Sequence, residues 1–214
     1  MNSLVKKIDE LIEQKSLLKH PFYQMWSDGN LTTEMLAGYS KEYFQMVKAV
    51  PLFVEQIGKF APNAASDEIR SNQQEEAEHI QPWTDFAASL GVQRDDITGY
   101  AGLEKTNQAV SEISSLITSL DAGAAAMYAF EKEIPKISQT KLEGLAKFYN
   151  ITSNDATNYF KLHMEADVRH AATWQNILEN VPEEKHAELI AVAEKSLDAQ
   201  NRLLDSCYES YCSL

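Results

Sequence analysis

The spacing of apolar residues constrains this chain more than any other feature of its sequence. Apolar side chains recur at intervals of three and four residues almost throughout, beginning with Leu4, Ile8, Leu11 and Ile12, and the period-two alternation of half-buried strands is nearly absent. The 214 residues include only 8 glycines and 6 prolines, which leaves too few breaks for many short strands. The pattern predicts an all-α protein, one bundle of about seven to eight helices that spans residues 1–214 as a single domain.

The charge balance and the chain ends exclude several classes of protein. Nineteen basic and 32 acidic side chains give a net charge of −13, which would repel nucleic acid and anionic lipid headgroups. The amino-terminal sequence MNSLVKKIDELIEQK lacks the uninterrupted apolar segment of a secretory signal. Cys207 and Cys212 are too few and too close to the C terminus for a disulfide framework. We therefore expect a cytoplasmic protein that binds neither nucleic acid nor membrane. We also expect a homodimer, and the sequence identifies no other protein partner.

Three of the predicted helices carry ionisable residues in the middle of their apolar stripes. These residues are Glu76 and His79 in the first helix, Glu131 in the second, and His163, Asp167 and His170 in the third. A fourth stripe carries Tyr39 and Tyr43 and no charge, which is typical of ordinary core. Burying an unpaired carboxylate costs several kcal/mol, so the three charged stripes need a shared compensating charge. A metal ion is the natural candidate.

The spacing on the third helix favours two ions over one. His163 and His170 share a face of the helix but lie about 10 Å apart along its axis, too far for one ion to bind both easily. Two ions could bind them, with Asp167 between the ions. Carboxylates with a few imidazoles suit iron or manganese better than structural zinc. The alternative is that each histidine is a hydrogen-bonded core residue and that Glu75 and Glu76 belong to a solvated acidic face. It accounts less well for a chain that places three of its five histidines on such stripes.

Four motifs carry a resemblance to one family. They are His20-Pro21-Phe22-Tyr23 followed by Trp26, the Glu75-Glu76 pair with His79 and Trp83, Tyr128-Ala129-Phe130-Glu131 with Ile134-Pro135, and His163-x-x-x-Asp-Val-Arg-His170. Together they resemble the haem-oxygenase-like di-metal oxidases of the TENA/THI-4/PqqC-like superfamily. The match is closest to the CADD-type proteins, named from a chlamydial protein that associates with death domains, which are para-aminobenzoate synthases. The last motif is specific, whereas the first alone would be weak.

The resemblance implies a haem-oxygenase-like bundle around two iron ions, or one iron and one manganese, that activate dioxygen with electrons from an external reductant. The family's metal ligands correspond to His79, Glu131, His163, Asp167 and His170. The remaining glutamate ligand is Glu75 by motif alignment and Glu76 by the stripe, and we prefer Glu76.

The resemblance also implies a self-sacrificing synthesis of para-aminobenzoate for folate. In this family a tyrosine supplies the ring and a lysine supplies the amine, and the matching residues are Tyr23 and Lys141. Tyr39 and Tyr159 match further tyrosines near the family's metal site, where they could relay electrons or radicals.

Two other functions remain open at this point. One is a cofactorless enzyme of the PqqC or TENA type, although the thiaminase-type members need a pocket cysteine and this chain has none before Cys207. The other is a non-catalytic helical adaptor, which would show a large exposed apolar patch.

Overall fold

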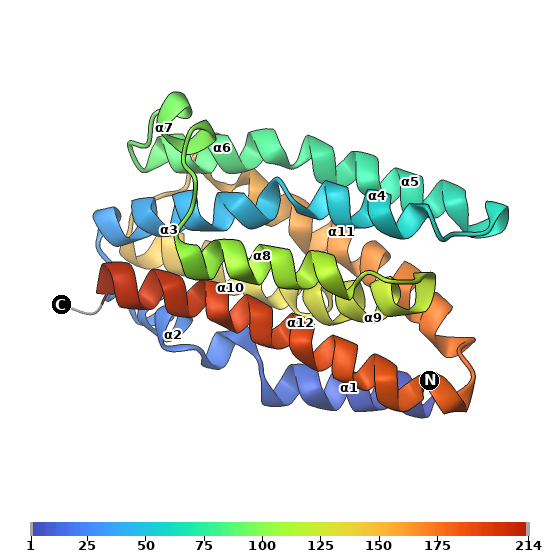
Figure 1. The fold of residues 1–214 in the computed structure, drawn as a ribbon. Helices are drawn as coiled ribbons and strands as arrows, with labels where there is room; N and C mark the ends of the chain where they lie inside the picture. Colours follow the sequence, from blue (N-terminus) through green and yellow to red (C-terminus); the bar gives the residue numbers. More distant parts are fainter. Residues whose placement is uncertain (1, 213–214) are drawn as a thin grey trace.

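A computed structural model describes residues 2–212, with the backbone alone described for residues 63–66. Every regular element in this range is helical, which confirms the all-α prediction (Figure 1). The α-helices are α1 (Ser3–Gln14), α2 (Pro21–Asp28), α3 (Thr33–Val47), α4 (Val50–Gly58), α5 (Asn63–Glu78), α6 (Ile80–Ser89), α7 (Arg94–Thr98), α8 (Glu104–Leu116), α9 (Leu120–Glu131), α10 (Ile134–Phe148), α11 (Asn154–Glu179) and α12 (His186–Cys207). A short 3-10 turn, η1 (Leu17–Lys19), precedes α2. No described helix is both long and apolar enough to cross a bilayer.

The helices are more numerous than expected because three stretches are each divided in two. Breaks separate α3 from α4, α5 from α6, and α9 from α10, and each following helix has a proline in its first turn: Pro51, Pro82 and Pro135. Proline lacks the N–H that a helix interior needs but fits the first turn, where that N–H would have no acceptor within the helix. The α3–α4 and α5–α6 pairs lie end to end in Figure 1. Each pair therefore keeps one direction while its axis is interrupted.

The longest helix, α11, runs through the bundle and positions the site. It begins at the cap residue Ser153, whose side chain accepts a hydrogen bond from the Ala156 N–H, and it packs against α6, α9 and α10. Its own Trp174 is almost completely buried, and so are Trp26 on α2 and Trp83 on α6. Because α11 contacts so many neighbours, its inward side chains face residues from several other helices.

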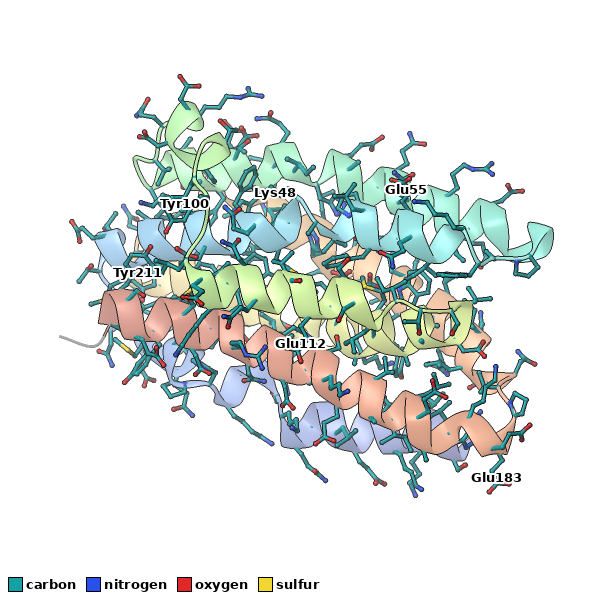
Figure 2. The ribbon with its side chains drawn as sticks, in the orientation of Figure 1. Lys48, Glu55, Tyr100, Glu112, Glu183 and Tyr211 are labelled. Atoms are coloured by element: carbon teal, nitrogen blue, oxygen red, sulfur yellow. The ribbon has the colours of Figure 1, made fainter. Side chains whose placement is uncertain are left out.

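One buried carboxylate lies outside this region and is fully hydrogen bonded. Glu42 accepts hydrogen bonds from the Thr106 hydroxyl at 2.6 Å, the Leu103 N–H at 3.1 Å, the Tyr211 hydroxyl at 3.2 Å and the Tyr100 hydroxyl. Figure 2 shows Tyr100 and Tyr211 at the same end of the bundle. This cluster ties α3 to α8 and to the C-terminal segment, and it shows how the fold satisfies a carboxylate that has a structural role.

Candidate metal centre and amine chamber

The structure brings the ionisable residues of the three stripes together in two groups of potential metal ligands. The His79 group consists of Glu76, His79 and His163, and the His170 group consists of Glu76, Glu131, Asp167 and His170. Within each group, one ligand atom from every residue lies within 4.8 Å of the others, and every member is buried. The six residues that the stripes singled out are the six that meet here.

Glu76 is the residue that the two groups share. Its Oε2 lies 3.6 Å from His79 Nδ1 and 4.0 Å from His163 Nε2, and its Oε1 lies 3.1 Å from His170 Nδ1. The placement of Asp167 between the two ions stays a prediction: among the described residues Asp167 belongs to the His170 group, and Glu76 is the member common to both groups. The physical reason is that Glu76 faces α11 from α5 and so reaches both His163 and His170, which lie two turns apart on α11.

Several ligand atoms in these groups have no hydrogen-bond partner among the described residues. They are Glu131 Oε1, both oxygens of Asp167, His79 Nδ1 and both ring nitrogens of His170. Buried polar atoms are nearly always satisfied, and this many exceptions at one place need an explanation. A bound cation would satisfy them together, and carboxylate with imidazole is a suitable ligand set for iron or manganese.

The pKa values of the three buried carboxylates also point to a missing positive charge. Burial and the nearby charge of Glu76 raise the pKa of Glu131, and burial with the charges of Glu76 and Glu131 raises the pKa of Asp167. Burial opposes ionisation of Glu76 too, but its contacts with His170 and His79 hold its pKa below the ordinary value. Without a cation, the centre therefore favours one ionised carboxylate and opposes the other two.

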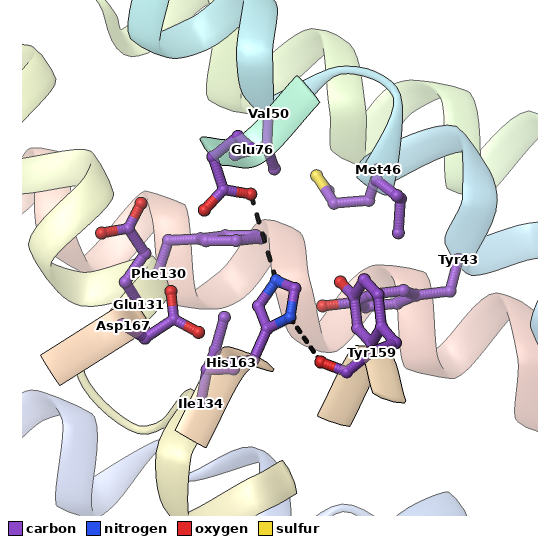
Figure 3. Close-up of a pocket in the computed structure, with 11 residues that line it drawn as sticks. Tyr43, Met46, Val50, Glu76, Phe130, Glu131, Ile134, Tyr159, His163 and Asp167 are labelled. Carbon is purple, nitrogen blue, oxygen red and sulfur yellow. Dashed lines mark hydrogen bonds and ion pairs between the residues drawn. The ribbon is translucent and has the colours of Figure 1, made fainter. Parts of the chain in front are cut away.

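Neighbouring groups fix the orientation of two ligands. His163 Nδ1 lies 2.8 Å from the carbonyl oxygen of Tyr159, so Nδ1 carries the proton and Nε2 faces Glu76 (Figure 3). Trp174 Nε1 donates to Glu131 Oε2 at 2.5 Å. Contacts of this kind set the tautomer and direction of metal ligands in proteins.

Glu75 lies outside both groups. Its carboxylate forms an ion pair with Arg169 and is partly exposed, whereas the Glu76 side chain is buried. Of the two glutamates that the sequence left open, the structure places Glu76 among the potential ligands and directs Glu75 toward the surface.

Tyr23 and Lys141 meet beside this centre, on helices distant in sequence. Lys141 on α10 donates from Nζ to the Tyr39 hydroxyl at 2.7 Å, and that hydroxyl lies 3.1 Å from the Tyr23 hydroxyl. The same Nζ lies 4.7 Å from the centre of the Tyr23 ring. All three side chains are buried, so the amine and the phenol are held together away from water.

The amine lies in an aromatic chamber, which we call the amine chamber. Its walls are the rings of Tyr23, Trp26, Tyr39, Tyr43 and Phe160, whose centres lie 4.7 to 5.7 Å from Lys141 Nζ. No carboxylate of the described residues contacts the amine. Burial therefore lowers the pKa of Lys141 to about 7, so that near neutral pH the amine can lose its proton.

Tyr43 joins the two regions and was missed as a site residue. It lines the pocket at the ligand groups with Glu76, Asp167 and Tyr159, and it also lines a second small cavity with Tyr23. Figure 3 shows Tyr43 and Tyr159 side by side at the His163 end of the pocket. The available signal was the spacing of Tyr39 and Tyr43, which puts both on one face of α3, but periodicity alone could not separate them from ordinary core.

Comparisons with known proteins agree with this architecture. Residues 5–210 match the model of the TENA/THI-4/PQQC family. The chain is 31% identical to a 4-aminobenzoate synthase of Nitrosomonas europaea over 99% of this chain and 94% of the relative. It is 28% identical to a 4-aminobenzoate synthase of Chlamydia muridarum over 97% of this chain and 91% of the relative.

Solved structures extend the agreement to the fold. A TenA homologue from Pseudomonas syringae superposes with a TM-score of 0.83 at 16% identity, covering 97% of this chain and 93% of that one. A Shewanella denitrificans domain with a haem-oxygenase-like fold superposes with a TM-score of 0.77 at 19% identity, covering 97% and 90%. The bundle is therefore haem-oxygenase-like, and the resemblance to para-aminobenzoate synthases is confirmed. From its matched length and its relatives, the chain belongs to the TENA/THI-4/PQQC family.

Proposed function

We propose that this protein is a dioxygen-dependent di-metal oxidase that makes para-aminobenzoate for folate synthesis from its own Tyr23 ring and Lys141 amine. The observation that carries the proposal is the position of the Lys141 amine, 4.7 Å from the centre of the Tyr23 ring and 5.1 Å from that of Tyr43, which lines the pocket at the ligand groups. The Nitrosomonas europaea relative, named as a 4-aminobenzoate synthase, supports the same product.

The His79 and His170 groups would hold two transition-metal ions, either two irons or one iron and one manganese. The shared Glu76 suits a ligand that bridges two ions, and the raised pKa values of Glu131 and Asp167 reflect charges that a cation would offset. When bound, the ions would supply dioxygen activation, with electrons from an external reductant.

The chain's own residues would hold the amine and the ring in position for each other. Para-aminobenzoate keeps the ring of tyrosine, has nitrogen in place of the phenolic oxygen and has a carboxylate at the Cβ position. The conversion therefore breaks the Cα–Cβ bond of Tyr23 and the Cε–Nζ bond of Lys141, releases the phenolic oxygen as water, and needs dioxygen as the oxidant that turns Cβ into the carboxylate. Tyr39 hydrogen bonds to both partners and so keeps the Lys141 amine near the hydroxyl end of Tyr23. The lowered pKa of Lys141 leaves a fraction of the amine with a free lone pair, as a nitrogen nucleophile requires. We assign Tyr39, Tyr159 and Tyr43 to the relay of electrons or radicals between the ligand groups and Tyr23.

The two alternative functions leave these features unexplained. A cofactorless enzyme gives no reason for six buried candidate ligands, four of which have unpaired atoms. An adaptor gives no reason for a buried amine over a buried phenol. The large apolar side chains exposed among the described residues are Leu52 and Phe60 on and just after α4, Phe148 at the end of α10, and Leu162 and Val168 on α11.

A single-turnover experiment tests the proposal. Protein loaded with iron, or with iron and manganese, is mixed with dioxygen and a reductant, and para-aminobenzoate is quantified. We expect at most one product per chain, none without dioxygen, and spent protein whose Tyr23 and Lys141 peptides have changed in mass. Many turnovers with an intact Tyr23 would contradict the self-sacrificing reaction.

A further inference from the structure

A carboxylate–guanidinium pair lies directly outside the His170 group. Glu75 on α5 and Arg169 on α11 precede Glu76 and His170 in the sequence. Arg169 donates from Nη1 to Glu75 Oε1 at 3.1 Å and from Nη2 to Glu75 Oε2 at 2.9 Å, so both oxygens are engaged. The two side chains are 28% and 61% exposed, whereas the His170 side chain behind them is fully buried. The pair therefore connects α5 and α11 at the surface, directly over a candidate ligand.

The His170 ring lies between this pair and the metal centre. Its Nδ1 is 3.1 Å from Glu76 Oε1, and its Nε2 is 3.4 Å from Glu75 Oε2. The two ring nitrogens thus face carboxylates on opposite sides, one inside the ligand group and one outside it. A neutral imidazole has one protonated nitrogen and one with a lone pair, so the partner of Nε2 determines whether the Nδ1 lone pair is free.

We propose that Glu75 is a positioning residue for His170. The 3.4 Å contact between Glu75 Oε2 and His170 Nε2 falls short of a hydrogen bond, and with an ion in the His170 group it would tighten so that Glu75 accepts the Nε2 proton. The Nδ1 lone pair would then be directed into the group, and Arg169 holds Glu75 in place through its two hydrogen bonds. The inference rests on the metal centre of the proposed function and extends it, since one metal position then depends on a surface ion pair. The His79 group does not include His170, so its ion should bind independently of Glu75.

Glu75 fits this role better than that of a ligand. Arg169 occupies both of its oxygens, and it lies on the side of the His170 ring opposite Glu76. A carboxylate that orients a metal-binding histidine typically changes metal affinity by about 10- to 100-fold when it is removed. A change in affinity of that size can be measured at the His170 group, with the His79 group as the internal reference.

Zinc titration of the full chain tests the proposal, because Zn(II) is diamagnetic and allows NMR of nitrogen-labelled histidines. In the wild type we expect two equivalents of Zn(II), with His170 coordinated through Nδ1 and protonated at Nε2. Glu75→Leu should weaken one position by about 10- to 100-fold and leave the other unchanged. Glu75→Gln keeps an acceptor oxygen, so its Zn(II) affinity at that position should fall less than in Glu75→Leu. This variant also tests the proposal if Glu75→Leu does not fold.

The matched control is Glu78→Leu, which removes the same charge from the same helix at an exposed side chain that hydrogen bonds only to Gln74 among the described residues. It should bind both ions as the wild type does. Equal loss at both positions in Glu75→Leu, or no loss at either, would overturn the proposal, and so would Zn(II) on Nε2 of His170. A wild type that binds no Zn(II) would instead remove the metal centre on which the proposed function itself depends.

Discussion

The ligand groups and the amine chamber share Tyr43 as a common wall, yet they bury opposite charges. The ligand groups gather three carboxylates and three imidazoles, several of their atoms are unpaired, and no lysine or arginine of the described residues contacts them. The chamber encloses one amine in aromatic rings, with no carboxylate from the described part of the chain in contact. Pairing Lys141 with Glu131 or Asp167 would have neutralised both regions, and the fold does not make that pair.

The difference shows that the two regions compensate for burial in different ways. In the ligand groups a bound cation would offset the repulsion of the carboxylates. In the chamber the amine loses its proton more readily, which removes the charge itself. Glu42 shows a third solution, a carboxylate satisfied entirely by hydrogen bonds, so the unpaired oxygens of Asp167 are not a general property of this bundle. Because the amine does not pair with the carboxylates, it stays available to react with Tyr23, and the carboxylates stay available to bind a metal ion.

The largest expected effect is the loss of para-aminobenzoate when the chamber is changed and the ligand groups are left intact. Tyr23→Phe removes the phenolic oxygen, and Lys141→Met replaces the amine by an apolar side chain of similar length. Both should abolish para-aminobenzoate, because each removes an atom that the reaction requires, and both should bind metal as the wild type does. Product quantified by mass spectrometry, with metal content measured on the same samples, checks this. Product from either variant would show that the ring or the amine comes from elsewhere.

The next largest expected effect is on metal content, which should differ between variants of two candidate ligands. Glu76→Ala should lose both ions, because Glu76 belongs to both groups, whereas Asp167→Ala should lose the ion of the His170 group and keep the other. Metal analysis with circular dichroism, to show that the helices persist, makes the measurement. His186→Ala is the control, since His186 lies at the start of α12 and contacts Ser3 and the Val181 carbonyl. Retention of both ions in Glu76→Ala would remove the shared role assigned to this residue.

The pH dependence of the reaction should follow the amine of the chamber. Because the pKa of Lys141 is lowered to about 7, the unprotonated fraction increases with pH through this value and falls about tenfold for each pH unit well below it. The facing titratable groups are Tyr23, Tyr39, Tyr43 and Cys207, which are neutral in this range because burial raises the pKa of each. Single-turnover rates between pH 5.5 and 8.5, with metal content checked at each point, test this. A rate independent of pH over this range would mean that deprotonation of Lys141 does not limit the reaction.

The smallest expected effect is on stability. Lys141 binds its proton more weakly in the folded chain than in the unfolded one, so between about pH 7 and the ordinary value near 10.5 the unfolded chain holds more protons and stability increases with pH. Lys141→Met removes this penalty and should raise the free energy of unfolding at pH 7 by about 1–3 kcal/mol, with a smaller gain at pH 9.5. Urea denaturation at the two pH values gives the comparison. A loss of stability at pH 7 would show that the hydrogen bond to Tyr39 outweighs the cost of burying the amine.

The ligand groups could be predicted from the sequence because each ligand interrupts an apolar stripe on its own helix. Periodicity identified the buried face of each helix, and that face was enough to choose Glu76 over Glu75 one position away. Lys141 gave no such signal. Only the resemblance pointed to it, because a single lysine near the middle of α10 is ordinary in sequence.

The sequence by itself determined that the chain is all helical and which side chains each helix turns inward, since both follow from local spacing. The tertiary structure alone decided which inward side chains meet. It made Glu76 the member common to both groups of potential ligands, placed Tyr43 between the two regions, and put the Lys141 amine over the Tyr23 ring. The physical reason is that periodicity describes directions around one helix axis, whereas these contacts depend on how separate helices pack, and residues on different helices leave no shared local pattern.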